Sequence, residues 1–291
     1  MPPIEIWVNG LVLSCIYITM AFGMMLVFSI MGLLNWSHGQ FYMLGAYIVY
    51  FAVTAAGVPF LLSLVIAAVV MGAIGMIIQR HMMQRIEKSV VGQAMGPVYV
   101  GISTLALTML FEGIATMAFG SGARGMTPVY KGSTVIGPVS IGNQQIFIAV
   151  FTVVILLALY VVLNKTKVWL AIRAASQDKY TAGLYGINVP AIAVIVMGVG
   201  CALAAMAGGI VTPLFSIDPF IGMLALMSAL LAIVIGGLGS LTGAVVGGLL
   251  LGFLGSVGAY YITHLYEIAL FGLVIIVLLV RPQGLFGRTE R

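Results

Sequence analysis

Two long stretches of this chain carry no charged side chain. One extends from Ile6 to Gln79 and the other from Pro219 to Tyr266, and neither contains Asp, Glu, Lys or Arg. About 20 apolar residues suffice for a helix to cross the hydrocarbon core of a bilayer. Charged residues make up only 7% of the 291 residues, whereas a soluble domain carries roughly 25%. We therefore expect an all-α fold, a polytopic transmembrane helical bundle.

Apolar runs and the residues that break them divide the chain into about nine predicted membrane segments. Their approximate ranges are 7–30, 40–57, 59–79, 96–119, 145–163, 190–211, 221–235, 243–262 and 265–280. Two regions, at 35–40 and 236–243, interrupt otherwise apolar sequence. We expect residues 1–291 to form a single transmembrane domain, with a polar segment at about 164–188 outside the membrane.

The basic residues indicate how the chain is oriented. The predicted loop 80–88 holds three, the segment 165–179 holds four and the tail 281–291 holds three, which together make ten of the twelve Lys and Arg residues. With nine spans, these three regions fall on one side of the membrane. The positive-inside rule places that side in the cytoplasm, so the N-terminus is predicted outside and the C-terminus inside. The net charge of +5 is then explained by membrane loops and requires no nucleic acid partner.

The sequence lacks the motifs of several kinds of enzyme and metal site. It contains no G-x-x-x-x-G-K-[ST] phosphate-binding loop, no H-E-x-x-H and no G-x-S-x-G. Its three histidines, His38, His81 and His264, lie on different predicted segments. We therefore expect no catalytic residue, no metal site and no ATP-binding site within this chain.

Glu112 is the one acidic residue placed well inside a predicted span. A carboxylate there is costly and by default suggests a function. It is equally explained by a polar interior or by protonation against a neighbouring helix. One such residue is thin support for proton or sodium coupling, which usually needs several intramembrane ionisable groups.

The two interruptions are candidates for a transport pathway. Unwound backbone in a bilayer must line a cavity or be buried in protein, and paired interruptions in the two halves of a chain are typical of transporters. The alternative is that both are ordinary tight turns between helices. The candidate pathway residues are Asn35, Ser37, His38, Gly39 and Gln40 in the first region and Gly237, Gly239 and Ser240 in the second.

The segment 243–262 has the pattern of a packing helix. Gly243 and Gly247 form one G-x-x-x-G pattern, and Gly248 and Gly252 form a second. Small residues at this spacing let helix backbones approach closely in lipid. We expect packing inside the bundle rather than a subunit interface.

The polar segment 164–188 contains a predicted helix from Ala171 to Tyr185. Four residues can share an apolar stripe beside polar positions: Leu170, Ala174, Tyr180 and Leu184. Such a helix can lie on a membrane surface or dock into a groove on a soluble partner.

Several ordered motifs together resemble a known family. They run through the whole chain: Gly32-Leu33-Leu34-Asn35-Trp36-Ser37-His38-Gly39 with Met43-Leu44-Gly45-Ala46-Tyr47, Arg173-Ala174 with Gln177-Asp178 and Ala182, Gly186-Ile187-Asn188, Gly236-Gly237-Leu238-Gly239-Ser240 with Gly243, and Arg281-Pro282-Gln283-Gly284-Leu285-Phe286-Gly287. Their order and spacing resemble the LivH-type permease subunits of branched-chain amino acid ABC importers.

The resemblance implies a bacterial inner-membrane permease without cofactors of its own. ATP and Mg²⁺ would bind in two separate cytoplasmic subunits, a second related permease would complete the membrane part, and a periplasmic binding protein would deliver a branched-chain or other hydrophobic amino acid, or a similar small solute. A short cytoplasmic helix would couple the ATPases to the membrane. The implied coupling residues are Ala171, Arg173, Ala174, Asp178, Ala182 and Gly186.

This chain departs from the family pattern in two places. The family commonly has a glycine and a basic residue before the Arg-Ala pair, where this chain has Trp169 and Leu170. It also commonly has Leu-Ala-His-Gly at the first interruption, where Trp36 and Ser37 replace Leu and Ala. A bulky ring and a hydroxyl there would reshape the pathway. The alternatives to an ABC importer are an ion-coupled secondary carrier and a passive channel for urea or short amides.

Overall fold

The computed structural model of this chain describes residues 4–88, 92–136, 139–262 and 266–287. Helices dominate these residues, and the one sheet among them is a small antiparallel hairpin. The expected all-α class is therefore confirmed apart from that hairpin. In chain order the elements are α1 (Ile4–Met31), α2 (His38–Thr54), α3 (Phe60–Ile78), the π-helical η1 (Gln79–Met83), α4 (Gln84–Lys88), α5 (Gly92–Phe119), β1 (Ser133–Ile136), β2 (Val139–Gly142), α6 (Asn143–Lys165), α7 (Lys167–Gln177), α8 (Lys179–Leu184), α9 (Val189–Val211), α10 (Ile221–Gly236), α11 (Leu241–Tyr261) and α12 (Tyr266–Val280).

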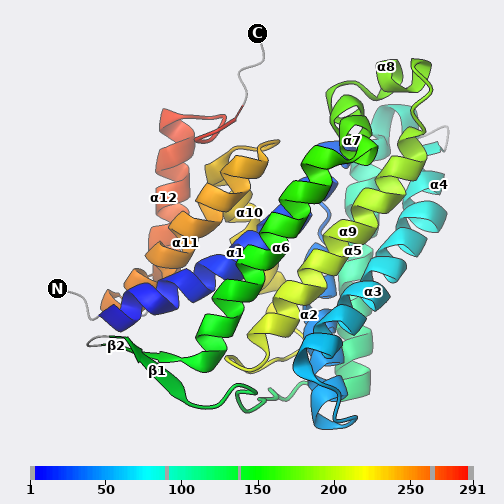
Figure 1. The fold of residues 1–291 in the computed structure, drawn as a ribbon. Helices are drawn as coiled ribbons and strands as arrows, with labels where there is room; N and C mark the ends of the chain where they lie inside the picture. The colour runs from blue at the N-terminus through cyan, green and yellow to red at the C-terminus, as the bar shows by residue number, and fades with distance from the viewer. Residues whose placement is uncertain (1–3, 89–91, 137–138, 263–265, 288–291) are drawn as a thin grey trace.

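The helix α9 forms the centre of the bundle. It packs against α1, α2 and α3, and Figure 1 shows it running alongside α3. Glycines make these contacts close: a Cβ on Gly200 would meet the Gly23 carbonyl of α1, and a Cβ on Gly208 would overlap the Tyr42 carbonyl of α2. Such small residues bring backbones together where hydrophobicity cannot drive association.

The two glycine patterns of α11 face two different helices. A Cβ on Gly247 would overlap the Ala232 carbonyl of α10, whereas a Cβ on Gly252 would overlap the backbone of Ser14 on α1. The expected packing inside the bundle is therefore confirmed. These contacts seat α11 between α10 and the first helix of the chain.

Six helices in the described part of the chain are long and apolar enough to cross a membrane. They cover Ile4–Met31, Phe60–Glu87, Val98–Phe119, Asn143–Val162, Val189–Val211 and Leu241–Tyr261. The predicted count of about nine segments is not confirmed. The expected segments at 40–57, 221–235 and 265–280 correspond to α2, α10 and α12, which have 17, 16 and 15 residues. At 1.5 Å per residue these helices rise only about 22–26 Å, less than the roughly 30 Å of a hydrocarbon core.

Two polar regions also differ from expectation. The region 80–88 is helical, because α3 continues through the π-helical turn η1 into α4. The single helix expected from Ala171 to Tyr185 is divided into α7 and α8 at Asp178, whose backbone is extended. Asp is a preferred N-cap residue, and its side chain accepts hydrogen bonds from the Tyr180 and Thr181 amides. The capping preference of one residue thus outweighs the helix-forming tendency around it.

The elements that carry most of the basic residues lie at one end of the bundle. In Figure 1, α4, α7 and α8, the α10–α11 turn and the C-terminal end of α12 are at the top, and the hairpin β1–β2 is at the bottom. The hairpin pairs Ser133 with Gly142 and Ile136 with Val139. It lies within the Gly- and Pro-rich connection before α6.

Candidate translocation and coupling site

The segment 32–37 connects α1 to α2 and is stabilised by its own side chains. Gly32, with a φ of +68°, ends α1. The Asn35 Oδ1 then accepts hydrogen bonds from the Ser37 amide at 3.0 Å and from the Ser37 Oγ at 2.7 Å. Asn35 and Ser37 are buried. Unwound backbone in a bundle interior must find its hydrogen-bond partners within the protein, and the Asn35 side chain provides one for the Ser37 amide.

This segment places the start of α2 in the interior of the bundle. The Trp36 amide donates to the Oγ1 of Thr104, near the middle of α5, at 3.4 Å. Further along α2, the ring of Tyr47 stacks on Phe119, the last residue of α5, with 4.5 Å between ring centroids. Tyr47 lies nine residues after His38, which is a helix rise of about 13 Å. The first residue of α2 therefore lies about that much deeper in the bundle than the end of α5. The first interruption is therefore at mid-depth and is not a surface turn.

A second short helix begins at the same place. A Cβ on Gly39 would overlap the carbonyl of Gly222 in the first turn of α10, and a Cβ on Gly222 would lie 3.1 Å from the Gln40 Oε1. His38, Gly39 and Gln40 are all buried, and the Gln40 Oε1 has no hydrogen-bond partner among the described residues. The N-termini of α2 and α10 thus meet inside the bundle.

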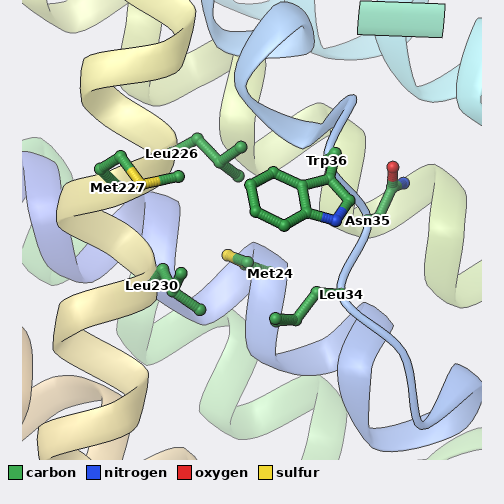
Figure 2. Close-up of a pocket in the computed structure, with 7 residues that line it drawn as sticks. All are labelled: Met24, Leu34, Asn35, Trp36, Leu226, Met227 and Leu230. Carbon is green, nitrogen blue, oxygen red and sulfur yellow. The ribbon is translucent and has the colours of Figure 1, made fainter. Parts of the chain in front are cut away.

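The Trp36 side chain lies between the segment 32–37 and the side chains of α10. Figure 2 shows its indole ring extending toward Leu226, while the Asn35 amide points away from it. The cavity that remains holds only about 10 Å³, which is room for about one water molecule. Its lining is almost entirely apolar and comprises Met24, Leu34, Asn35, Trp36, Leu226, Met227 and Leu230. The site is closed in this conformation, with an aromatic ring filling an apolar cradle.

The second interruption is a turn at the end of α10. Gly237 and Gly239 have φ angles of +102° and +94°, which favour glycine. Ser240 caps α11, because its Oγ accepts a hydrogen bond from the Gly243 amide at 3.0 Å. The C-terminal tail pairs with the end of α10, where the Phe286 amide donates to the Gly236 carbonyl at 2.9 Å. Of the two alternatives left open by the sequence, the tight turn describes this region.

The two interruptions therefore lie far apart. From Gly222 to Gly236, α10 rises through 14 residues, about 21 Å. Gly239 and Ser240 instead lie beside Arg173 of α7, around a cavity of about 270 Å³ that also contacts Met25 and Ser29 of α1. The structure thus separates the predicted pathway residues into an interior group and an end group, and it places the end group beside the predicted coupling helix.

The predicted coupling residues lie on α7, on α8 and in the turn that follows. Arg173 and Asp178 are exposed, Ala171 and Ala174 are half-buried, and Ala182 is buried. Gly186 ends the segment with a φ of +80°. Hydrogen bonds from the Thr181 side chain and amide hold the pKa of the Asp178 carboxyl below its usual value. The segment is thus anchored on one side and solvent-exposed on the other.

Sequence comparison decides the family of this chain. A family model for the permease component of branched-chain amino acid transport systems matches residues 6–279. This chain belongs to that permease family. It is 31% identical to the high-affinity branched-chain amino acid permease LivH of Escherichia coli K12, over 97% of this chain and 94% of the relative.

Other relatives show the same relationship. The chain is 33% identical to the permease BraD of Pseudomonas aeruginosa, over 97% of the chain and 95% of the relative, and 26% identical to a probable LivH permease of Methanocaldococcus jannaschii. No solved structure matches this chain. The permease is a multi-pass membrane protein, and its relatives are named as transport components rather than enzymes. They do not support the alternatives of an ion-coupled carrier or a passive urea or amide channel.

The remaining candidates lie apart from the interior junction. Glu112 is half-buried on α5, eight residues or about 12 Å of helix rise beyond Thr104, between the exposed Met109 and Met117. Within the described ranges, no group of three His, Cys, Asp or Glu residues could hold a metal ion. The predicted pathway also omitted the apolar lining residues, such as Leu226 and Leu230. An apolar residue within an apolar helix gives no signal in a single sequence, so their role appears only when α10 is placed opposite Trp36.

Proposed function

We propose that this permease is a membrane-spanning subunit of an ATP-driven importer that carries branched-chain or other hydrophobic amino acids. The family and the names of its relatives support this assignment. Residues 1–291 would act as one permease domain in the bacterial inner membrane. The apolar side chain of such an amino acid also suits the cradle around Trp36, whose lining is almost wholly aliphatic or aromatic.

The partners follow from the same proposal. Two cytoplasmic subunits would bind and hydrolyse ATP with Mg²⁺, a second related permease would face this one, and a periplasmic binding protein would deliver the solute. The N-terminus would be periplasmic and the C-terminus cytoplasmic. Supporting this orientation, α4, α7, α8 and the end of α12 share one end of the bundle, and they include or adjoin the three basic regions.

The interior junction is the observation that carries the proposed pathway. Helices that start at mid-depth, with polar side chains buried at the break, are typical of substrate sites in transporters. Asn35, Ser37, His38, Gly39 and Gln40 would form this part of the pathway, with Trp36 closing it. Opening would require the indole to leave the space in front of Leu226. Glu112 would face the outer part of the same route or a neighbouring helix.

The end group would take part in coupling rather than in solute binding. Gly237, Gly239 and Ser240 lie at the turn, and Arg173 lies across the 270 Å³ cavity from them. The ATPase subunits would press on α7 and α8 through Ala171, Arg173, Ala174, Asp178, Ala182 and Gly186. The exposed Tyr180, Leu184 and Tyr185 give that surface an apolar face for a protein partner.

Purification and reconstitution test the proposed function. The permease is purified in mild detergent from its native membranes, the co-purifying chains are identified by mass spectrometry, and the complex is reconstituted with its binding protein. We expect P-loop ATPases and a second permease in the complex, and leucine uptake that needs ATP. A matched complex with the P-loop lysine of the ATPases replaced should show no uptake. A chain that purifies alone and moves leucine without ATP would contradict the proposal.

A further inference from the structure

The helices α7 and α8, here called the coupling segment, rest on the last turns of α1. Ile172 of α7 and Ala182 of α8 are buried in one apolar cluster with Phe22, Leu26 and Ile30 of α1. The coupling segment thus touches the helix that leads into the interior junction, and it also contacts α9. A displacement of this segment would therefore act on the end of α1.

A charged contact joins the same two elements. The Lys179 Nζ donates a hydrogen bond to the carbonyl of Met31, the last residue of α1, at 3.4 Å, across a sequence separation of 148 residues. The last turn of α1 contains no basic residue of its own. The final carbonyls of a helix lack intrahelical partners and carry partial negative charge, so a cation beside them is stabilising. Lys179 supplies that cation from another part of the chain.

The helix α4, with Glu87 near its end, lies at the same end of the bundle as α8. The helix α4 continues back through η1 into α3, which packs against the central helix α9. Asp178 caps α8 immediately before Lys179 and so fixes where this side chain begins. Lys179 therefore joins the start of α8 to the end of α1.

The end of α1 is separated from the interior junction by a very short connection. Five residues, 32–36, lie between Met31 and Ser37, and their conformation is defined by Gly32 and by the Asn35 hydrogen bonds. The Gly32 amide donates to the Phe28 carbonyl at 2.8 Å, which ties this connection to the last turn of α1. Because this connection is short and its conformation is fixed, a movement of Met31 would also displace Trp36.

We propose that Lys179 is a positioning residue that transmits the movement of the coupling segment to the interior junction through the carbonyl end of α1. This inference rests on the proposed function. Lys179 touches neither the solute nor ATP in this proposal. It keeps α1 attached to α8 during the transport stroke, so that the segment 32–37 and Trp36 move when α8 moves.

The test uses the complete importer in liposomes and measures leucine uptake and ATP hydrolysis together. In Lys179→Met, we expect the uptake per ATP hydrolysed to fall at least about fivefold, the lower end of typical coupling effects between sites. ATP hydrolysis and the amount of co-purifying ATPase should stay close to the unmodified complex. Lys179→Arg should retain most uptake because it keeps the cation. The matched control is Lys131→Met, because the exposed Lys131 lies two residues before β1, and the hairpin β1–β2 is at the opposite end of the bundle from α8.

Chemical rescue separates this role from a folding defect. In Lys179→Cys, aminoethylation with bromoethylamine restores a lysine-like side chain in protein that has already folded. We expect coupling to recover on aminoethylation and not after alkylation with iodoacetamide. The native Cys15 and Cys201 are buried, and the unmodified chain treated in parallel controls for their reaction.

Three results would overturn the inference. Lys179→Met with unchanged uptake per ATP would show that the contact transmits nothing. Loss of the ATPase subunits from the Lys179→Met complex would place Lys179 in docking instead. Failure of aminoethylation to restore coupling would exclude a role for the ammonium group. If the unmodified complex itself shows no ATP-dependent leucine uptake, the proposed function fails as well, and that result is distinct from the other three.

Discussion

Segment 35–40 opens a helix in the interior of the bundle, whereas segment 236–243 joins two helices at one end of it. Inside, the backbone depends on neighbouring side chains: Asn35 accepts two hydrogen bonds from Ser37, and Thr104 of α5 accepts one from the Trp36 amide. At the end of the bundle, glycines adopt the positive φ angles of the turn, and the C-terminal tail donates hydrogen bonds to carbonyls at the end of α10. The difference shows that the depth of a break within the bundle, rather than its irregular backbone, decides which groups must satisfy its hydrogen bonds.

The largest expected difference concerns one glycine in each region. In Gly39→Ala the new Cβ would overlap the Gly222 carbonyl, and a backbone group cannot rotate away, so we expect a loss of about 3 kcal/mol or failure to assemble. In Gly239→Ala the φ of +94° is strained but the space is open, so we expect a loss of about 1 kcal/mol. Thermal unfolding of the two variants in detergent measures both effects. Equal midpoints would remove the structural basis for treating the regions differently.

The next effect concerns solute selection. Trp36→Ala should open the cradle beside Leu226 and change the ratio of uptake rates for phenylalanine and valine by about tenfold, because filling or emptying an apolar pocket typically changes discrimination by 1–3 kcal/mol. Leu238→Ala should leave this ratio within about twofold, since Leu238 lies on the exposed turn and surface changes are usually worth less than 0.5 kcal/mol. Both variants need total uptake per complex as a reference. A ratio that changes as much in Leu238→Ala as in Trp36→Ala would contradict the pathway assignment.

The smallest effects come from single hydrogen bonds. Thr104→Val removes the acceptor for the Trp36 amide, and Ser240→Ala removes the cap of α11. Each should cost about 1 kcal/mol of stability, so unfolding midpoints alone do not separate them. Leucine uptake should separate them, because only the first bond holds the interior junction. If Ser240→Ala lowers uptake while Thr104→Val does not, the functional difference between the regions is reversed.

The sequence predicts much of this architecture because its strongest signals are compositional. The absence of charge predicts the membrane bundle, and the spacing from Gly243 to Gly252 predicts the close packing of α11. The ordered motifs from Gly32 to Gly287 predict the family, which the relatives confirm. Each of these signals depends only on residue type and spacing, and the sequence alone provides both.

The depth of the interruptions and the length of the spans are not predicted from one sequence. Helix α10 is as apolar as the full spans, and hydropathy does not reveal that α2 and α10 start against each other at Gly39 and Gly222. Gly237 and Gly239 break a helix in sequence as clearly as Asn35 does, yet only the tertiary contacts distinguish a buried break from a surface turn. The role of Lys179 is hidden for the same reason, because its partner carbonyl at Met31 carries no sequence signal.

The depth of the two interruptions in a bilayer is the most direct test of their different placement. Nitroxide spin labels on Leu34→Cys and on Leu238→Cys, in permease reconstituted into liposomes, report depth through their relative exposure to oxygen and to a water-soluble nickel complex. We expect the label at position 34 to lie near the bilayer centre and the label at position 238 to lie at the membrane–water interface. Two labels at the same depth would contradict the claim that only the first interruption is a mid-membrane element.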